Sequence, residues 1–213
     1  MIKIRRARQF FMAAVFMAVF IFGWIYPILG FFIPLCMILG IGIGLFKGRK
    51  FCDWYCPRGS FYDAWFKSLS PQRKIPALFK NIYFRLGVLL FLMAVMVVNL
   101  FYRWPNPINI GMFFVIMMTS TTVLGVGLAL FFHQRSWCSF CPVGTIANLA
   151  GRNKFSLMIN SQDCNECKAC AKVCPIQIEP YKFKKTGIRE VKDFDCLKCG
   201  TCVAACPKKA LSF

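Results

Sequence analysis

Long uncharged segments alternate with short basic ones along the first part of the chain. From Phe10 to Phe46 there is no charged residue, which is too long for one membrane span of roughly 20 residues but long enough for two short helices. Pro27, Gly30 and Pro34 lie near the middle of this segment, where a turn between the helices is expected. The pattern predicts a helical hairpin, with one span plus a re-entrant segment as the alternative.

A second pair of apolar segments follows, at Leu86–Tyr102 and Met112–Phe132. The turn-rich stretch RWPNPINI joins them at residues 103–110. We therefore expect a membrane all-α fold with four transmembrane helices for this part of the chain. No Asp or Glu lies within a predicted span, so the sequence gives no support for a proton pathway of carboxylates through the bilayer.

Composition and charge indicate how the predicted helices are oriented in the membrane. The chain has 213 residues, 58% of them hydrophobic, with a mean hydropathy of +0.56 and a net charge of +19, which indicates a membrane protein with basic loops. Basic residues gather before the first apolar pair and between the two pairs, at Lys3, Arg5, Arg6, Arg8, Lys47, Arg49, Lys50, Arg58, Lys67, Arg73, Lys74 and Lys80. The opposite turns hold Arg103 alone. By the positive-inside rule, both termini and the central loop are predicted to be cytoplasmic.

The expected location is therefore the cytoplasmic (inner) membrane, with a multi-pass topology and membrane lipid as a partner. The basic excess is explained by this topology, and we expect no nucleic-acid partner.

Each apolar pair is followed by basic residues and then by a related cysteine motif, Cys-x(2–3)-Cys-Pro-x-Gly-[Ser/Thr]. The first copy is FCDWYCPRGS at residues 51–60, and the second is WCSFCPVGT at residues 137–145. This predicts a two-fold internal repeat whose halves face each other across a pseudo-twofold axis. The cysteines Cys52, Cys56, Cys138 and Cys141 would then meet and form a third cluster or another four-thiolate metal site. Redox dithiols and copper binding are the alternatives.

The C-terminal part holds two runs with the spacing Cys-x2-Cys-x2-Cys-x3-Cys-Pro. In bacterial two-cluster ferredoxins, three cysteines of one run and the fourth of the other bind each 4Fe–4S cluster. The pattern assigns one cluster to Cys164, Cys167, Cys170 and Cys206. It assigns the other to Cys196, Cys199, Cys202 and Cys174. Structural zinc is disfavoured because its four-cysteine sites are not built from tandem runs that each end in Cys-Pro.

Beyond about Phe155 the sequence becomes polar and rich in cysteine. We therefore divide the chain into a transmembrane domain with two cytoplasmic Cys-x(2–3)-Cys-Pro motifs, residues 1–154, and a ferredoxin domain, residues 155–213. The second domain is expected to have the α+β fold of two-cluster bacterial ferredoxins.

Taken together, these features resemble the NapH-type membrane-bound 4Fe–4S ferredoxin family, and NosR-type C-terminal halves and CcoG-type polyferredoxins share parts of the pattern. The resemblance covers nearly the whole chain and rests on the twelve motif cysteines named above. One departure is that the family usually shows Cys-x3-Cys-Pro twice, whereas the second motif here is Cys-x2-Cys-Pro. The family includes the membrane quinol-oxidising component of periplasmic nitrate reductase systems.

The leading hypothesis is a membrane-bound iron–sulfur electron-transfer subunit. It would relay electrons between the quinone pool or a membrane partner and a redox partner enzyme, either as a quinol dehydrogenase subunit of a larger oxidoreductase complex or as an electron-transfer protein. The alternative is a cupric reductase or a metal-handling maturation factor of the CcoG type.

A quinone and proton site would need polar groups near the cysteine motifs. The candidates are His133, Asp53, Asp63 and Tyr62. Because His133 is the single histidine, a bis-His haem within this chain is excluded. Cys36, which stands alone in an apolar segment, is interpreted as a small buried hydrophobic residue.

Overall fold

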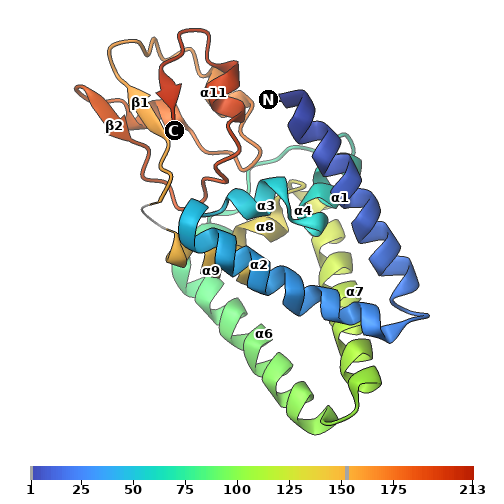
Figure 1. The fold of residues 1–213 in the computed structure, drawn as a ribbon. Helices are drawn as coiled ribbons and strands as arrows, with labels where there is room; N and C mark the ends of the chain where they lie inside the picture. The colour runs from blue at the N-terminus through green and yellow to red at the C-terminus, as the bar shows by residue number, and fades with distance from the viewer. Residues whose placement is uncertain (1, 152–153) are drawn as a thin grey trace.

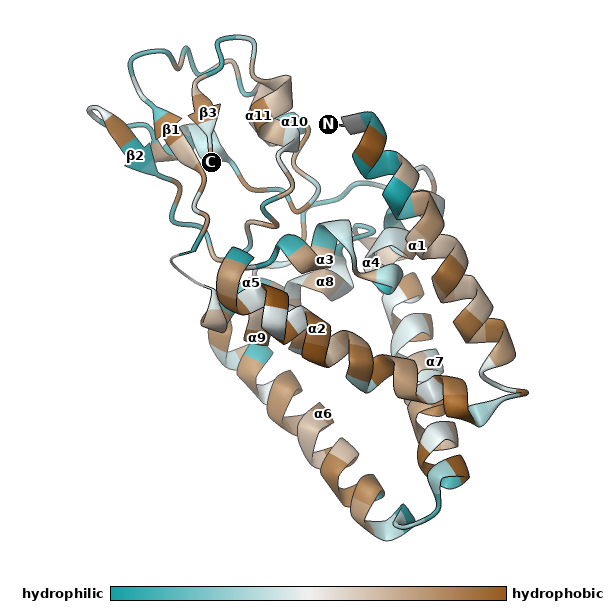
Figure 2. Cartoon of the chain, viewed as in Figure 1, coloured by the Kyte–Doolittle hydropathy of each residue, from teal (hydrophilic) through white to brown (hydrophobic). Residues whose placement is uncertain are grey.

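The structure, a computed structural model, describes residues 2–151 and 154–213. Long helices form one end of the molecule, short helices lie across its middle, and a small domain with a sheet forms the other end (Figure 1). Brown hydrophobic residues dominate the long helices, whereas teal hydrophilic residues gather at the start of α1 and over the small domain (Figure 2). This distribution matches a membrane part joined to a polar domain.

The first apolar segment folds into two helices joined by a turn. α1 covers Ile2–Phe22, a 3-10 turn follows at Pro27–Phe31, and α2 covers Phe32–Lys47. The turn packs closely on α7, because a Cβ at Gly30 would clash with the carbonyl oxygen of Gly111, and one at Gly111 would clash with the carbonyl oxygen of Pro27. The predicted hairpin with a turn near Pro27 is therefore present.

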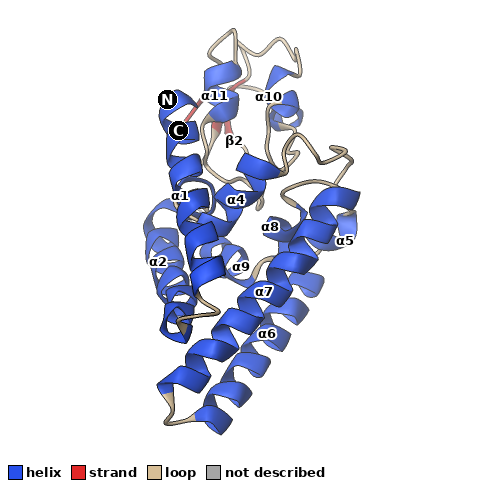
Figure 3. Cartoon of the chain, turned by 90° about the vertical axis from the view of Figure 1, so that its right-hand side faces the viewer, coloured by secondary structure: helices blue, strands red, loops and turns tan. Residues whose placement is uncertain are grey.

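The second apolar pair forms α6, Ile82–Arg103, and α7, Pro107–Phe131. The two helices run antiparallel and side by side (Figure 3). Each begins at an asparagine, because Asn81 and Asn106 accept a hydrogen bond from the second following backbone N–H and so satisfy a free donor of the first turn. Large apolar side chains of α6 such as Leu90 and Phe91 are exposed, as expected for a lipid-facing surface.

Three helical segments among the described residues are long and apolar enough to cross a membrane, over Pro27–Lys47, Ile82–Arg103 and Pro107–Phe131. The fourth span that the sequence predicted, in α1, is not one of them. The first turns of α1 are basic, and its apolar part, Phe10–Phe22, is shorter than the roughly 20 residues that a span needs.

Short helices lie where the long helices end, and four of those described carry the two Cys-x(2–3)-Cys-Pro motifs. These short helices are α3 Lys50–Trp54, α4 Pro57–Trp65, α5 Ala77–Lys80, α8 Ser136–Phe140 and α9 Pro142–Ala150. In each motif one short helix ends, the second cysteine follows, and proline opens the next helix. Proline suits the first helical position because its missing N–H would have no partner there.

The C-terminal domain combines a small sheet with two short helices. Strands β1 Met158–Asn160, β2 Ile188–Glu190 and β3 Leu211–Ser212 form an antiparallel sheet in the order β2-β1-β3. Helices α10, Ala169–Lys172, and α11, Thr201–Ala205, each lie within a cysteine run, and a 3-10 turn covers Pro180–Phe183. This α+β arrangement is the one predicted for the C-terminal domain.

Candidate functional site

Two small cavities in the C-terminal domain are each walled by four cysteines. One, with an empty volume of about 340 Å³, has Cys164, Cys167, Cys170 and Cys206 in its wall. The other, with an empty volume of about 370 Å³, has Cys174, Cys196, Cys199 and Cys202 in its wall. The structure thus groups the cysteines in the two sets of four that the spacing suggested, and each set takes one cysteine from the other run.

The two runs owe this shape to left-handed residues at equivalent positions. The second cysteine of the first run lies between Glu166 and Lys168, which have φ of 57° and 61°. In the second run Lys198 and Gly200 occupy the same places, with φ of 53° and 78°. Left-handed backbone reverses the chain direction locally, so the three consecutive cysteines of each run can face one centre.

The donors in these two cavities suit a cluster bound by thiolates. Besides cysteine, the walls consist largely of apolar side chains such as Leu157, Ile176 and Ile159. Sulfur donors in apolar surroundings are the environment of iron–sulfur clusters. Over the described residues, no group of three or more His, Cys, Asp or Glu side chains is arranged to hold a single metal ion.

The membrane-edge motifs come together beneath the C-terminal domain, although 83 positions separate Arg135 from Cys52. Nη1 of Arg135 donates to the carbonyl oxygen of Cys52 at 3.0 Å and to Sγ of Cys138 at 3.8 Å, and Arg58 of the first motif donates to Sγ of Cys141 in the second at 3.5 Å. Burial raises the pKa of the Cys52 thiol to about 12; Arg49 acts to lower it, and Cys56, Cys141 and Cys138 act to raise it. We call Cys52, Cys56, Cys138 and Cys141 the edge cysteines.

Two buried arginines cross between the motifs in a reciprocal pattern. Arg49, three residues before Cys52, donates through Nη2 to the carbonyl oxygen of Cys138 at 2.5 Å. Arg135, three residues before Cys138, donates through Nη1 to the carbonyl oxygen of Cys52 at 3.0 Å. The arginine that precedes each motif therefore donates a hydrogen bond to the backbone carbonyl of the first cysteine in the opposite motif.

The glycine of each motif leaves space for the opposite arginine. A Cβ at Gly59 would lie 2.9 Å from Nη1 of Arg135, and one at Gly144 would lie 3.1 Å from Nη2 of Arg49. Both separations are shorter than ordinary van der Waals contact. The glycines are thus part of the arrangement that joins the motifs.

The carboxylates near the edge cysteines are paired with arginine. Asp53 accepts two hydrogen bonds from Arg5, at 2.6 and 2.7 Å, and Asp63 accepts two from Arg135, at 2.9 and 2.6 Å. Burial disfavours the charge of Asp63, but Arg135 and Arg5 outweigh it and lower the pKa of this carboxyl. Both carboxylates, which the sequence analysis placed in a proton site, are ion-pair partners here.

His133 and Tyr62, the other candidates for a quinone and proton site, are also engaged. His133 is buried, which lowers its pKa to about 4, and its Nδ1 accepts a hydrogen bond from the backbone N–H of Arg135. The Tyr62 hydroxyl donates to the carbonyl oxygen of Thr122 in α7. A large cavity lies beside the edge cysteines. The described residues of its wall do not include His133, Tyr62, Asp53 or Asp63.

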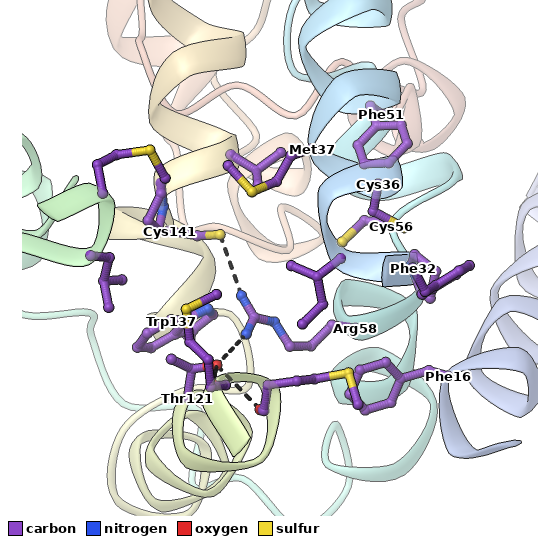
Figure 4. Close-up of a pocket in the computed structure, with 18 residues that line it drawn as sticks. Phe16, Phe32, Cys36, Met37, Phe51, Cys56, Arg58, Thr121, Trp137 and Cys141 are labelled. Carbon is purple, nitrogen blue, oxygen red and sulfur yellow. Dashed lines mark hydrogen bonds between the residues drawn. The ribbon is translucent and has the colours of Figure 1, made fainter. Parts of the chain in front are cut away.

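That cavity, with an empty volume of about 850 Å³, lies between the edge cysteines and the long helices. Its walls include Cys56 and Cys141 together with apolar residues of α1, α2, α6 and α7. Arg58 extends into it and donates to Thr121 at 2.9 Å and to Sγ of Cys141 at 3.5 Å (Figure 4). Cys36 also lines the cavity, so its surroundings are not simply packed core.

The ferredoxin domain is attached to the edge motifs by a buried carboxylate. Asp195, beside Cys196, accepts from Arg49 at 2.9 Å and from Arg85 of α6 at 2.8 Å. Both arginines and the aspartate are almost fully buried. Arg49 therefore contacts both Cys138 of the edge cysteines and Asp195, the neighbour of Cys196 in the ferredoxin domain.

Sequence reasoning missed Arg49, Arg58, Arg85, Arg135, Thr121 and Asp195 as site residues. One signal for the crossed pair was present, since an arginine precedes the first cysteine by three positions in both motifs.

Two protein-family models match the chain. A model described as a 4Fe-4S dicluster domain matches residues 156–207, and one described as a 4Fe-4S binding domain matches twice, over residues 29–76 and 110–158. The C-terminal ferredoxin prediction is thereby confirmed, and 4Fe–4S clusters are its cofactors.

Several curated proteins are similar to most of the chain. An uncharacterized protein of Methanocaldococcus jannaschii is 29% identical over 83% of this chain and 76% of its own length. The ferredoxin-type protein NapH of Haemophilus influenzae is 27% identical over 78% of this chain and 62% of its own length. The putative electron transport protein YccM of Escherichia coli is 28% identical over 81% of this chain and 53% of its own length.

No solved structure matches the chain. Its relatives and both family models nevertheless agree with the cysteine pattern and the apolar helices. They support an iron–sulfur electron-transfer role for a chain with membrane-type helices, and they confirm its similarity to the NapH-type family of ferredoxin-type proteins.

Proposed function

We propose that this protein relays electrons between the quinone pool or a membrane partner and a redox partner enzyme, through three iron–sulfur centres in series. Two centres belong to the ferredoxin domain, residues 155–213, with the ligand sets of the two cysteine-walled cavities. The third joins Cys52, Cys56, Cys138 and Cys141 at the membrane edge. The basic residues near α1 and between α2 and α6 favour a cytoplasmic position for this end of the molecule.

The observation that carries the third centre is the meeting of the two cysteine motifs through crossed arginines. Arg49 and Arg135 bind the opposite motif, so the two pairs of cysteines are fixed as one group. The double match of one family model supports a pseudo-twofold repeat. The donor set, one buried and three partly buried thiols, suits a cubane cluster.

The buried charges favour an anion among the edge cysteines. Arg49, Arg58 and Arg135 contact these cysteines, and Arg5 and Arg85 join them through shared carboxylates. The carboxylates of this network are Asp53, Asp63 and Asp195. Buried cations without an equal number of anions are costly. A cluster held by four thiolates is an anion and would balance the excess.

The packing supports an order for the three proposed centres. Cys52 shares one apolar cluster with Cys174, Cys196 and Cys199, which belong to the nearer ferredoxin cavity. That cavity shares a second apolar cluster with the farther one through Cys202 and Cys170. Cys167 in the farther cavity is exposed. Electrons would pass between the membrane edge and the surface at Cys167 by way of the middle centre.

Iron and acid-labile sulfide analysis of the anaerobically purified protein tests the relay. We expect about twelve irons per chain, from three four-iron clusters. Cys52→Ser and Cys138→Ser should lower this to about eight and remove one EPR signal, whereas the matched control Cys36→Ser should not.

About eight irons in the wild-type protein, with no metal held by the edge cysteines, would refute the third centre. Retention of twelve irons in both serine variants would refute the ligand assignment.

A further inference from the structure

We propose that the large apolar cavity beside Cys56 and Cys141 binds the head group of a lipid-soluble quinone, with Arg58 and Thr121 as its hydrogen-bonding residues. The inference deepens the proposed function, on which it rests, by placing the membrane-side electron carrier. It assigns this carrier to residues other than His133, Asp53, Asp63 and Tyr62.

The cavity has the walls of a site for a lipophilic ligand. Small-molecule sites are lined mainly by apolar side chains with a few polar groups, and this cavity has that composition. Phe32 of α2, Leu92 of α6 and Met117 of α7 illustrate its apolar lining. Because α2, α6 and α7 lie in the segments that, among the described residues, are long and apolar enough to span a membrane, a ligand could reach the cavity from the bilayer.

Arg58 supplies the polar group that orients a ligand. Its guanidinium lies 5.0 Å from the centre of the Trp137 ring and uses one nitrogen for Thr121 and the other for Cys141. A guanidinium has five N–H donors, so donors remain for a carbonyl or hydroxyl oxygen. Within residues 2–151 and 154–213, no ion pair joins Arg58 to a carboxylate.

The position of the cavity favours a redox-active ligand. Cys56 and Cys141, two of the proposed ligands of the edge centre, are in its wall. A head group on Arg58 would therefore lie beside that centre, since Arg58 itself contacts Cys141. An apolar ring with oxygen acceptors and an apolar tail is the chemistry of a quinone, which suits both the walls and the location.

The electron and proton balance of the step is simple. Oxidation of one bound hydroquinone breaks its two O–H bonds, gives two electrons one at a time to the cluster chain, and releases two protons to water. Arg58 remains protonated throughout because guanidinium does not lose its proton in proteins. The described lining of the cavity contains no Asp, Glu or His, so this arginine binds and orients the head group and does not accept the proton.

The test uses the whole protein with its clusters in lipid nanodiscs. Cys36→Trp places an indole in the cavity from α2, and Leu39→Trp is the matched control, because Leu39 on the same helix is half exposed. Arg58→Gln removes the head-group donor, and Arg58→Lys restores a charge without the planar fork. The readouts are iron content, clusters reducible by dithionite, and the rate of cluster reduction by menaquinol and ubiquinol analogues.

We expect Cys36→Trp to lower quinol-dependent reduction at least tenfold, with iron content and dithionite-reducible clusters unchanged and Leu39→Trp equal to the wild type. Arg58→Gln should raise KM for the quinol at least tenfold, and Arg58→Lys should recover part of the loss. Normal quinol kinetics in both Cys36→Trp and Arg58→Gln would overturn the inference while leaving the relay intact.

A second measurement separates the site from the relay. In the cluster-loaded protein Cys36 is the one cysteine outside the proposed ligand sets, so its alkylation by a small electrophile reports on the cavity. Protection of Cys36 by a quinone analogue supports the site, whether or not quinol reduces the clusters. Failure of every quinol to reduce the wild-type clusters would instead refute the quinone-pool relay. Protection by a fatty acid and not by the quinone would overturn the inference.

Discussion

The ferredoxin cavities and the edge cysteines are both built from four thiols, but they are held together by different means. In the ferredoxin domain, left-handed residues such as Lys168 and Gly200 turn short runs around a common centre. At the membrane edge, the cysteines come from two distant segments, and the crossed side chains of Arg49 and Arg135 join them. A locally encoded site depends on backbone conformation, whereas the edge site depends on buried charge.

Removal of Arg135 should break the edge site and spare the ferredoxin centres. Arg135→Ala leaves Asp53 and Asp63 with one buried partner fewer and frees the Cys52 carbonyl. Loss of one partner of a buried ion pair costs about 3–5 kcal/mol. We expect this loss in the free energy of unfolding, together with about four irons fewer per chain.

Thermal unfolding and iron analysis of the detergent-solubilised protein measure both effects. Arg6→Ala, at an exposed position, is the control. A full complement of iron in Arg135→Ala would show that the edge site does not depend on this arginine.

Replacement of Asp195 should weaken the contact between the edge motifs and the ferredoxin domain, while the edge site and the ferredoxin centres still form. Asp195→Asn weakens the bonds to Arg49 and Arg85, and hydrogen bonds to charged groups contribute about 1.5–3 kcal/mol. We expect slower reduction of the ferredoxin clusters by electrons that enter at the membrane edge, with normal iron content and normal direct reduction by dithionite. Asp163→Asn, at an exposed position of the same domain, is the control; equal rates in both variants would contradict the role of Asp195.

The sequence predicted the local features well because their physical causes are local. The apolar segments at Leu86–Tyr102 and Met112–Phe132 correspond to α6 and α7, since helix length and hydropathy are properties of one segment. The ferredoxin domain followed from cysteine spacing in the same way. The span predicted in α1 is not confirmed, because basic residues enter this helix and its apolar part, Phe10–Phe22, is short.

The contacts between distant residues could not be predicted in this way. Asp53 and Asp63 looked like free carboxylates beside cysteines, but Arg5 and Arg135 reach them from 48 and 72 positions away. Thr121 lies in an apolar segment, and its contact with Arg58, 63 positions away, exists only after α4 packs on α7. The spacing of residues within one motif does not indicate which distant residues will contact it.

The two motif glycines offer a finer comparison between the halves of the edge site. An alanine at Gly59 would place its Cβ 2.9 Å from the backbone oxygen of Cys52, which cannot move freely. At Gly144 the nearest atom, 3.1 Å away, is the end of the Arg49 side chain. Because overpacking costs about 1–3 kcal/mol, we expect Gly59→Ala near the upper end of this range and Gly144→Ala near the lower end. Unfolding measurements that give the reverse order would contradict this explanation.

His133 provides the smallest expected effect, and it shows how the edge site responds to pH. Burial lowers the pKa of His133 to about 4 in the folded protein, whereas a free histidine has a pKa near 6.5. The unfolded chain therefore binds more protons between these values, and the folded state loses stability as the pH falls from about 6.5 towards 4. His133→Gln should make the unfolding temperature less dependent on pH from about 7 to 5.5, a window chosen so that the clusters survive. An unchanged pH dependence in the variant would mean that His133 is protonated equally in both states.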